Sequence, residues 1–260
     1  MQTPSANAIE PLVLYASRLV DGYLGSGLTA LYLRGSAARD DWVPAFSDID
    51  LYVVVKDELS YQRLALESEL RQAMQLAFPK QQVSCRVVTE MNVYSDRVGS
   101  YLTGLGSKLI SGKSILEEQK APTSIELQVF GQRYLRNLNQ FWRKLRFQRN
   151  TLEDDTRRLA QLVLKSAQSI LLANGNLVLK KEKAAELFVK RFANCPLAYV
   201  VEKANEIRLS WPQPTKHPEE LSTFCIDAVS FLSGLESYLI PAGRRYSNLT
   251  ESIKLPSQIC

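Results

Sequence analysis

The chain has 260 residues, of which 45% are hydrophobic and 23% charged, and a formal net charge of +5 at pH 7. This is the composition of an ordinary globular protein, long enough for one large or two modest domains with real cores. No apolar stretch approaches the roughly 18 to 20 residues that a membrane-spanning helix needs, and the start of the chain lacks a basic region followed by an apolar one. We therefore expect a cytoplasmic protein.

Histidine and cysteine chemistry is poorly represented in this sequence. The single histidine, His217, lies in a proline-rich loop, and the four cysteines are widely scattered. The sequence therefore indicates neither a zinc site nor a histidine-based catalytic triad. Any acid–base chemistry must come from carboxylates, lysine, tyrosine or a bound metal.

Helical and extended patterns alternate in the first half of the chain. The spacing of apolar and β-branched residues predicts a helix over residues 5–24, strands over 28–33 and 48–55, a helix over 60–78 and a strand over 83–89. Residues 101–122 follow as a helix and loop, with a short extended return at 108–116. This order predicts a small mixed sheet with flanking helices.

From residue 124 onward the apolar spacing is helical throughout. The predicted helices cover residues 127–150, 154–174, 181–192, 197–210 and 218–240. We therefore expect an α/β domain over residues 1–120, an all-α helical bundle domain over 121–245 and a flexible tail over 246–260.

Two carboxylates stand at the start of the second predicted strand, in the sequence Asp48-Ile49-Asp50. Side chains i and i+2 of a strand project to the same side, so Asp48 and Asp50 are adjacent, while Ile49 and Leu51 face a core. Carboxylates this close repel each other unless a cation lies between them. Such oxygen ligands suit magnesium, which takes one or two protein carboxylates together with substrate phosphates. The pair therefore predicts a metal-dependent nucleotide site.

A glycine turn precedes this pair. The first predicted strand ends in Arg34-Gly35-Ser36. Glycine lets the backbone turn sharply and approach a ligand closely, and the serine offers a hydroxyl and an amide to a phosphate. The two patterns together predict phosphate binding at the end of one strand and metal binding on the next.

The combined pattern resembles the nucleotidyltransferase superfamily of DNA polymerase β, in which a hydrophobic strand, Gly-Ser, a short intervening stretch and an Asp-x-Asp strand follow one another. Here these parts are residues 31–36, 37–47 and 48–55. The helical segment at 157–192 and the connector at 108–116 resemble the corresponding parts of the two-domain aminoglycoside adenylyltransferases. The resemblance thus implies an α/β nucleotidyltransferase domain followed by a helical domain.

This resemblance also implies roles for individual residues. Asp48 and Asp50 would be catalytic and would hold Mg²⁺, with ATP or another NTP as the substrate. An acceptor hydroxyl would attack the α-phosphorus and pyrophosphate would leave. The implied nucleotide-binding residues are Gly35, Ser36, Arg39, Ser47, Lys165 and Lys181.

Enzymes of this superfamily commonly place a third carboxylate on the strand after the helix, where it acts as a metal ligand or general base. Here that strand carries Ser84 or Arg86 where an acid is expected. The nearest acid and candidate third catalytic residue is Glu90, although roughly 13 to 20 Å of strand separates it from those positions. Otherwise a base comes from Glu126 or the acidic cluster at 153–155, or turnover is weak or absent.

Charge bears on the identity of the acceptor. Residues 131–191 contain 14 Lys and Arg against 5 Asp and Glu, whereas a polycationic aminoglycoside needs an acidic pocket. The basic helical half therefore lowers the expectation of an aminoglycoside acceptor.

Three functional hypotheses follow. The leading one is transfer of AMP from ATP to a hydroxyl of a small molecule, of which an aminoglycoside-like antibiotic is one example. The second is a catalytically impaired nucleotide-binding or antitoxin-like protein of the same fold that acts on or with a protein partner. The third is a nucleic-acid end-modifying transferase, which only the basic half favours. We expect no membrane partner, and the sequence does not indicate the oligomeric state.

Overall fold

The computed structural model describes residues 9–145, 151–211 and 217–235. The chain divides into two units between Pro122 and Thr123, and each unit is described by itself. The flexible tail expected over 246–260 lies outside the described residues, as do the ends of the helices predicted over 127–150 and 218–240.

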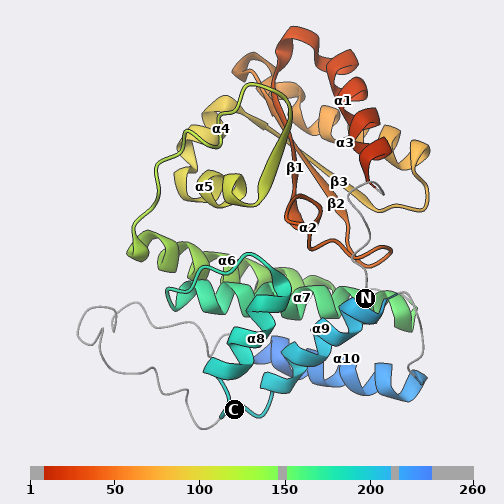
Figure 1. Ribbon diagram of the computed structural model, residues 1–260, viewed down its shortest axis with the longest axis vertical. Helices are drawn as coiled ribbons and strands as arrows, with labels where there is room; N and C mark the ends of the chain where they lie inside the picture. The colour runs from red at the N-terminus through yellow and green to blue at the C-terminus, as the bar shows by residue number, and fades with distance from the viewer. Residues whose placement is uncertain (1–8, 146–150, 212–216, 236–260) are drawn as a thin grey trace. The chain divides into compact units, whose positions relative to one another are not determined.

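A four-stranded sheet with the order β3-β2-β1-β4 forms the centre of the first unit (Figure 1). β1 runs antiparallel to both of its neighbours, β2 and β4, whereas β2 and β3 are parallel. The parallel pair is joined through helix α3 (Arg63–Ala77), because parallel strands need a crossover connection. The strands are β1 (Leu28–Arg34), β2 (Ile49–Val55), β3 (Val83–Thr89) and β4 (Ser107–Gly112).

The two faces of this sheet are covered by different elements. Odd-numbered residues of β1, β2 and β3 face α1 (Glu10–Leu24) and α3, and the expectation that Ile49 and Leu51 face a core is confirmed. Even-numbered residues, including Tyr32 and Tyr52, form a second cluster with Val93 of α4. We call this second side the α4 face. Figure 1 shows α1 and α3 on one side of the sheet and α4 and α5 on the other.

The described part of the first unit contains three short α-helices, of which the sequence predicted only α5 in part, as the helix at the start of residues 101–122. A single turn, α2 (Gly35–Ala38), follows β1, and α4 (Glu90–Ser95) and α5 (Arg97–Leu105) follow β3. A capping box begins α4: Thr89 Oγ1 accepts from the Asn92 amide at 3.3 Å, and Asn92 Oδ1 accepts from the Thr89 amide at 3.2 Å. This pair ends β3 and turns the chain into a helix.

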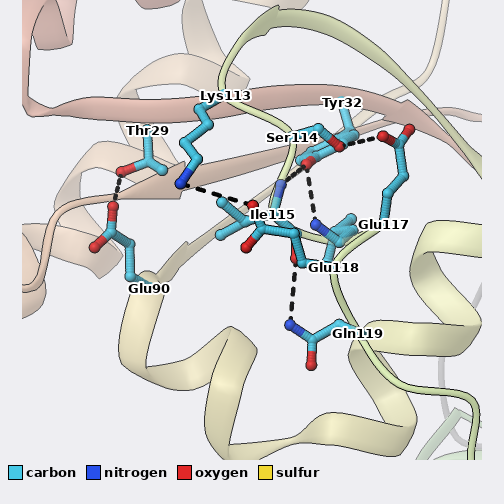
Figure 2. Close-up of polar contacts among 10 residues, drawn as sticks. Thr29, Tyr32, Glu90, Lys113, Ser114, Ile115, Glu117, Glu118 and Gln119 are labelled. Atoms are coloured by element: carbon cyan, nitrogen blue, oxygen red, sulfur yellow. Dashed lines mark hydrogen bonds and ion pairs between the residues drawn. The ribbon is translucent and has the colours of Figure 1, made fainter.

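The segment after β4 is fixed on the α4 face. The hydroxyl of Tyr32 accepts hydrogen bonds from the amides of Ile115 and Leu116, at 2.8 and 3.2 Å (Figure 2). Both of these residues are buried in the α4-face cluster. Ser114 donates to Glu117 and Gln119 donates to the Ile115 carbonyl, so the segment is also held by its own side chains.

The described residues of the second unit form five helices and no strand, so the expected combination of a mixed-sheet domain and an all-helical domain is confirmed. α7 contacts each of the other four helices and is buried on most sides, because its apolar residues are not confined to one stripe. Thr151 caps its first turn by accepting from the Asp154 amide at 3.2 Å. The helices are α6 (Ser124–Leu145), α7 (Leu152–Ala173), α8 (Lys181–Arg191), α9 (Ala198–Ser210) and α10 (Pro218–Ser233).

A close approach between two helices explains one glycine of the second unit. A Cβ atom at Gly131 of α6 would lie 2.6 Å from the Ala173 amide nitrogen of α7, so a side chain there would separate the two helices. Within the described residues, no helix combines the length and the apolar character needed to cross a membrane.

Candidate active site

The turn after β1 brings a glycine into contact with an aspartate of the next strand. Gly35 has a φ of +74°, a conformation that favours glycine. A Cβ atom at this position would also collide with Oδ2 of Asp50 and lie 3.3 Å from its Cγ. The backbone conformation and the position of the Asp50 carboxylate therefore both favour glycine here, and Asp50 is a predicted metal ligand.

Ser36 lies inside this turn and is buried. Its carbonyl accepts hydrogen bonds from the amides of Arg39 and Asp41, at 3.2 and 2.9 Å. These bonds fix the backbone that follows Gly35. The expected role of Ser36 and its amide in phosphate binding stays a prediction.

Ser47 closes the loop that leads to Asp48. Its buried hydroxyl accepts from the Val43 amide at 3.1 Å, and its carbonyl accepts from Trp42 Nε1 and Gln81 Nε2, at 3.1 and 3.2 Å. These contacts give Ser47 a structural role in positioning the next residue. A direct contact with the nucleotide stays a prediction.

The two aspartates lie where β2 begins. Asp48 immediately precedes the strand, Asp50 is its second residue, and both are half-buried. Ile49 between them donates to the Gln82 carbonyl at 2.9 Å, which starts the pairing with β3. Because strand side chains alternate, Asp50 belongs to the same face as Tyr52, the α4 face.

The two aspartates provide oxygen ligands suited to magnesium, but the described residues provide no third acidic ligand beside them. Asp50 forms no ion pair within the described parts of the chain, so its carboxylate oxygens are available. In the same described parts, no group of three or more His, Cys, Asp or Glu side chains is arranged to hold a metal. Two carboxylates are enough for magnesium when substrate phosphates complete its coordination.

The neighbouring strand supplies no acid beside Asp50. The parallel register places Ser84 next to Asp50 and Arg86 next to Tyr52, and both β3 side chains are exposed. The expected position of a third carboxylate is therefore occupied by Ser84, with Arg86 two residues later on the same face of the sheet.

Glu90 lies at the opposite end of the sheet from Asp50, and its role as a third catalytic carboxylate stays a prediction that this position does not favour. It is the first residue of α4 and not a strand residue. Six residues separate it from Ser84, the neighbour of Asp50, which corresponds to about 20 Å along a strand. Its Oε1 accepts from Thr29 Oγ1 at 2.6 Å (Figure 2). Glu90 thus fastens α4 to the start of β1.

Two of the other acids considered as a base, Glu126 and Asp154, lie at helix starts in the second unit. Oε2 of Glu126 accepts from the amide and the hydroxyl of Thr123, at 2.7 and 2.9 Å. Oδ2 of Asp154 accepts from the Thr151 hydroxyl at 3.1 Å. Helix capping is sufficient to explain both acids.

The three predicted basic nucleotide-binding residues have different surroundings. Arg39 is half-buried and lies against Gly106, where an added Cβ atom would be 2.9 Å from its Nη1. Lys165 is exposed on α7, and Lys181 is buried at the first position of α8. Nucleotide binding by these three residues stays a prediction.

Sequence reasoning missed a cationic arrangement on the α4 face. The Arg34 guanidinium carbon lies 5.5 Å from the centroid of the Tyr52 ring. Burial raises the pKa of Tyr52 above its usual value, while the charges of Arg34 and Arg86 act in the opposite direction. The signal was present in the sequence, because Arg34, Asp50 and Arg86 share one face once the strand register is known.

Residues 23–89 match the family model described as "Nucleotidyltransferase domain". The matched segment contains the Gly35–Ser36 turn, both aspartates and the whole of β3. This segment is similar to a nucleotidyltransferase domain. The predicted resemblance to nucleotidyltransferases and the prediction that the chain is an enzyme are confirmed by this match.

Most of the chain is also similar in fold to a known adenyltransferase. The structure of spectinomycin adenyltransferase AAD(9) from Enterococcus faecialis, with ATP and spectinomycin, is similar over 86% of this chain and 99% of that chain, with a TM-score of 0.57 and 12% sequence identity. At this identity the likeness concerns the fold, a nucleotidyltransferase domain followed by a helical unit. No curated protein sequence matches this chain significantly.

Proposed function

We propose that this chain is a magnesium-dependent nucleotidyltransferase that transfers AMP from ATP to a hydroxyl of a small-molecule acceptor. Transfer of a nucleoside monophosphate agrees with the nucleotidyltransferase domain, whereas the metal, the nucleotide and the acceptor are the proposed parts. The observation that carries the proposal is the contact between the Asp50 carboxylate and the backbone of Gly35. This contact joins the predicted metal ligand to the predicted phosphate-binding turn in a single site.

Each half of this site has a separate task in the proposed reaction. Asp48 and Asp50 hold Mg²⁺, which supplies neutralising charge for the triphosphate when it is bound. Gly35 presents its backbone without a side chain, so that the outer phosphates can approach the turn that contains Ser36. Positioning and charge neutralisation are the main contributions of a protein to phosphoryl and nucleotidyl transfer.

In the proposed reaction one bond to the α-phosphorus forms as another breaks. The acceptor oxygen forms a bond to the α-phosphorus of ATP, and the bond from this phosphorus to the oxygen that bridges to the β-phosphate breaks. Pyrophosphate leaves with the electron pair of that bond, and the acceptor hydroxyl proton is released to water. Nothing on β3 beside Asp50 takes up this proton, since the adjacent residue is Ser84.

A transfer assay tests the proposal directly. The purified chain is incubated with Mg²⁺, α-³²P-labelled ATP and a panel of hydroxyl compounds that includes spectinomycin, with separate reactions that contain RNA or cell protein. We expect label on a small molecule and no label with an Asp50→Asn variant. Label that appears equally with Asp50→Asn would overturn the proposed site, and label on RNA or protein would overturn the proposed acceptor class.

A second candidate function is favoured by the β3 residues. With Ser84 beside Asp50 and no acid on that side, the chain would bind ATP and magnesium without turnover, as a regulatory or antitoxin-like partner of another protein. Binding of a non-hydrolysable ATP analogue without any transfer of label would support this second function. The two-unit organisation, which we propose to correspond to domains over 1–120 and 121–245, is compatible with both.

A further inference from the structure

Two arginines flank Tyr52 on the face that carries Asp50. Arg34 is the register partner of Asp50 on β1, and Arg86 is the register partner of Tyr52 on β3. The Arg34 guanidinium lies over the Tyr52 ring, with its carbon 5.5 Å from the ring centroid. We refer to Arg34 and Arg86 as the arginine pair.

The arginine pair has no balancing carboxylate in contact. Within the described residues, neither guanidinium forms an ion pair. The acid whose charge also acts on Tyr52 is Asp96, and its Oδ1 accepts from the Gly99 amide at the start of α5, at 3.3 Å. Half-buried and exposed guanidinium groups without an ion-pair partner are ready to receive an anion.

Asp50 on β2 separates a nucleotide side, toward β1 and Arg34, from an acceptor side, toward β3 and Arg86. The Gly35–Ser36 turn follows β1, on one side of Asp50, whereas Ser84 and Arg86 belong to β3, on its other side. Two strand spacings, about 10 Å, separate β1 from β3. A triphosphate bound at the turn therefore leaves the β3 side of Asp50 for the acceptor.

We propose that the acceptor carries an anionic phosphate or carboxylate group close to its reactive hydroxyl, and that Arg86, assisted by Arg34, binds this group. The inference rests on the proposed function and specifies its substrate class. A guanidinium binds phosphate or carboxylate through two parallel hydrogen bonds. The positive charges of Arg34 and Arg86 repel a polycationic acceptor, because bringing like charges together near a protein surface costs appreciable free energy.

Calorimetric titration of the full chain tests this inference. The chain is first saturated with Mg²⁺ and α,β-methylene-ATP, and that binding step is measured separately. Four acceptor probes are then compared: ribose 5-phosphate, gluconate, neutral ribose and cationic spectinomycin. The first two distinguish a phosphate from a carboxylate as the recognised group.

We expect ribose 5-phosphate or gluconate to bind at least about tenfold more tightly than ribose, and Arg86→Ser to abolish this preference, as loss of a charge-assisted contact predicts. Arg86→Ser should leave the affinity for α,β-methylene-ATP unchanged. Arg71→Ser is the matched control, because Arg71 is exposed on α3, on the opposite face of the sheet. This control should retain the preference for the anionic probe.

Failure of this inference can be told apart from failure of the proposed function. If α,β-methylene-ATP itself does not bind, the proposed function fails and the acceptor class fails with it. If the nucleotide analogue binds but both anionic probes bind no better than ribose, only the acceptor class is overturned. The same conclusion follows if Arg86→Ser weakens nucleotide binding as strongly as it weakens probe binding.

Discussion

The carboxylate of Asp50 lies so close to Gly35 that a Cβ atom at position 35 would displace it. The positive φ of this glycine adds a second restriction. The conformation of the turn at Gly35 and the position of Asp50 on β2 therefore depend on each other. Any change at Gly35 is therefore also a change at Asp50.

Gly35→Ala should lower the rate of AMP transfer by at least about 100-fold, because the new methyl group displaces the Asp50 carboxylate. We also expect a loss of about 1 to 3 kcal/mol in the free energy of unfolding from the strained backbone. Gly22→Ala is the control, because Gly22 lies in α1 with no atom within 4 Å of an added Cβ. Denaturant titration and initial transfer rates check both effects, and a fully active Gly35→Ala would contradict the described contact.

Replacement of Asp48 or Asp50 tests the proposed metal site through metal binding, which is measured independently of activity. Asp48→Asn and Asp50→Asn should each weaken Mn²⁺ binding, measured by electron paramagnetic resonance in the presence of ATP, by about tenfold or more. Asp40→Asn is a nearby control. Asp40 is exposed and pairs with Lys108, at 3.1 Å, and such surface pairs contribute little. Equal Mn²⁺ affinity in all three variants would exclude a metal site at the aspartates.

Ser84 is the place to restore the carboxylate that β3 lacks. Ser84→Glu puts an acid next to Asp50, at an exposed position that tolerates a larger side chain. If the chain lacks a general base, we expect the maximal transfer rate to rise by about 100-fold or more, since general bases contribute on that scale. Ser84→Ala removes the hydroxyl without adding charge and should leave the rate unchanged. A Ser84→Glu rate at or below that of Ser84→Ala would show that no acid is missing.

The sequence predicted the parts of the fold that depend on local patterns. Runs of β-branched residues located β2 and β3 to within a residue at their first position, and helical spacing located α3 and the helices of the second unit. The alternation in β2 also placed Ile49 and Leu51 on a buried face. These predictions succeed because each rests on contacts among neighbours in the chain or on a single apolar face.

The errors and omissions concern contacts that local patterns do not encode. The sequence predicted that the strand ends at Thr89, but it did not predict the Thr89–Asn92 capping box that makes Glu90 the first residue of α4. The contact of Gly35 with Asp50 and the arginine pair both depend on the register between strands. Register is a property of the assembled sheet, and one residue of slip exchanges its two faces.

Variants of Glu90 separate a structural role of this residue from a catalytic one. Glu90→Gln keeps an oxygen that accepts from Thr29, so we expect transfer rates and stability close to those of the unchanged chain. Glu90→Ala leaves the nearly buried Thr29 hydroxyl without this acceptor and should cost about 1 to 3 kcal/mol of unfolding free energy. Transfer rates and denaturant titrations of both variants are the measurement. Loss of transfer in a stable Glu90→Gln would return Glu90 to the catalytic residues.

Cys85 lies on β3 next to Ser84 but faces the core formed with α1 and α3. Burial, with a smaller contribution from the negative charge of Glu67, raises the pKa of this thiol to about 12. The folded protein therefore keeps Cys85 protonated at pH values at which the thiol of the unfolded chain has already ionised. Iodoacetamide at pH 8 should label Cys85 only after the chain is unfolded in guanidinium chloride, since the thiolate is the reactive form.

The same pKa shift predicts how stability depends on pH. Above about pH 9 the unfolded chain binds fewer protons at Cys85 than the folded chain, so the free energy of unfolding falls as pH rises toward 12. The slope from this thiol is at most about 1.4 kcal/mol per pH unit. Lysines and tyrosines titrate in the same range, so the quantity to measure is the difference in slope between the unchanged chain and Cys85→Ala. Parallel stability curves for the two proteins from pH 8 to 11 would contradict a buried, protonated Cys85.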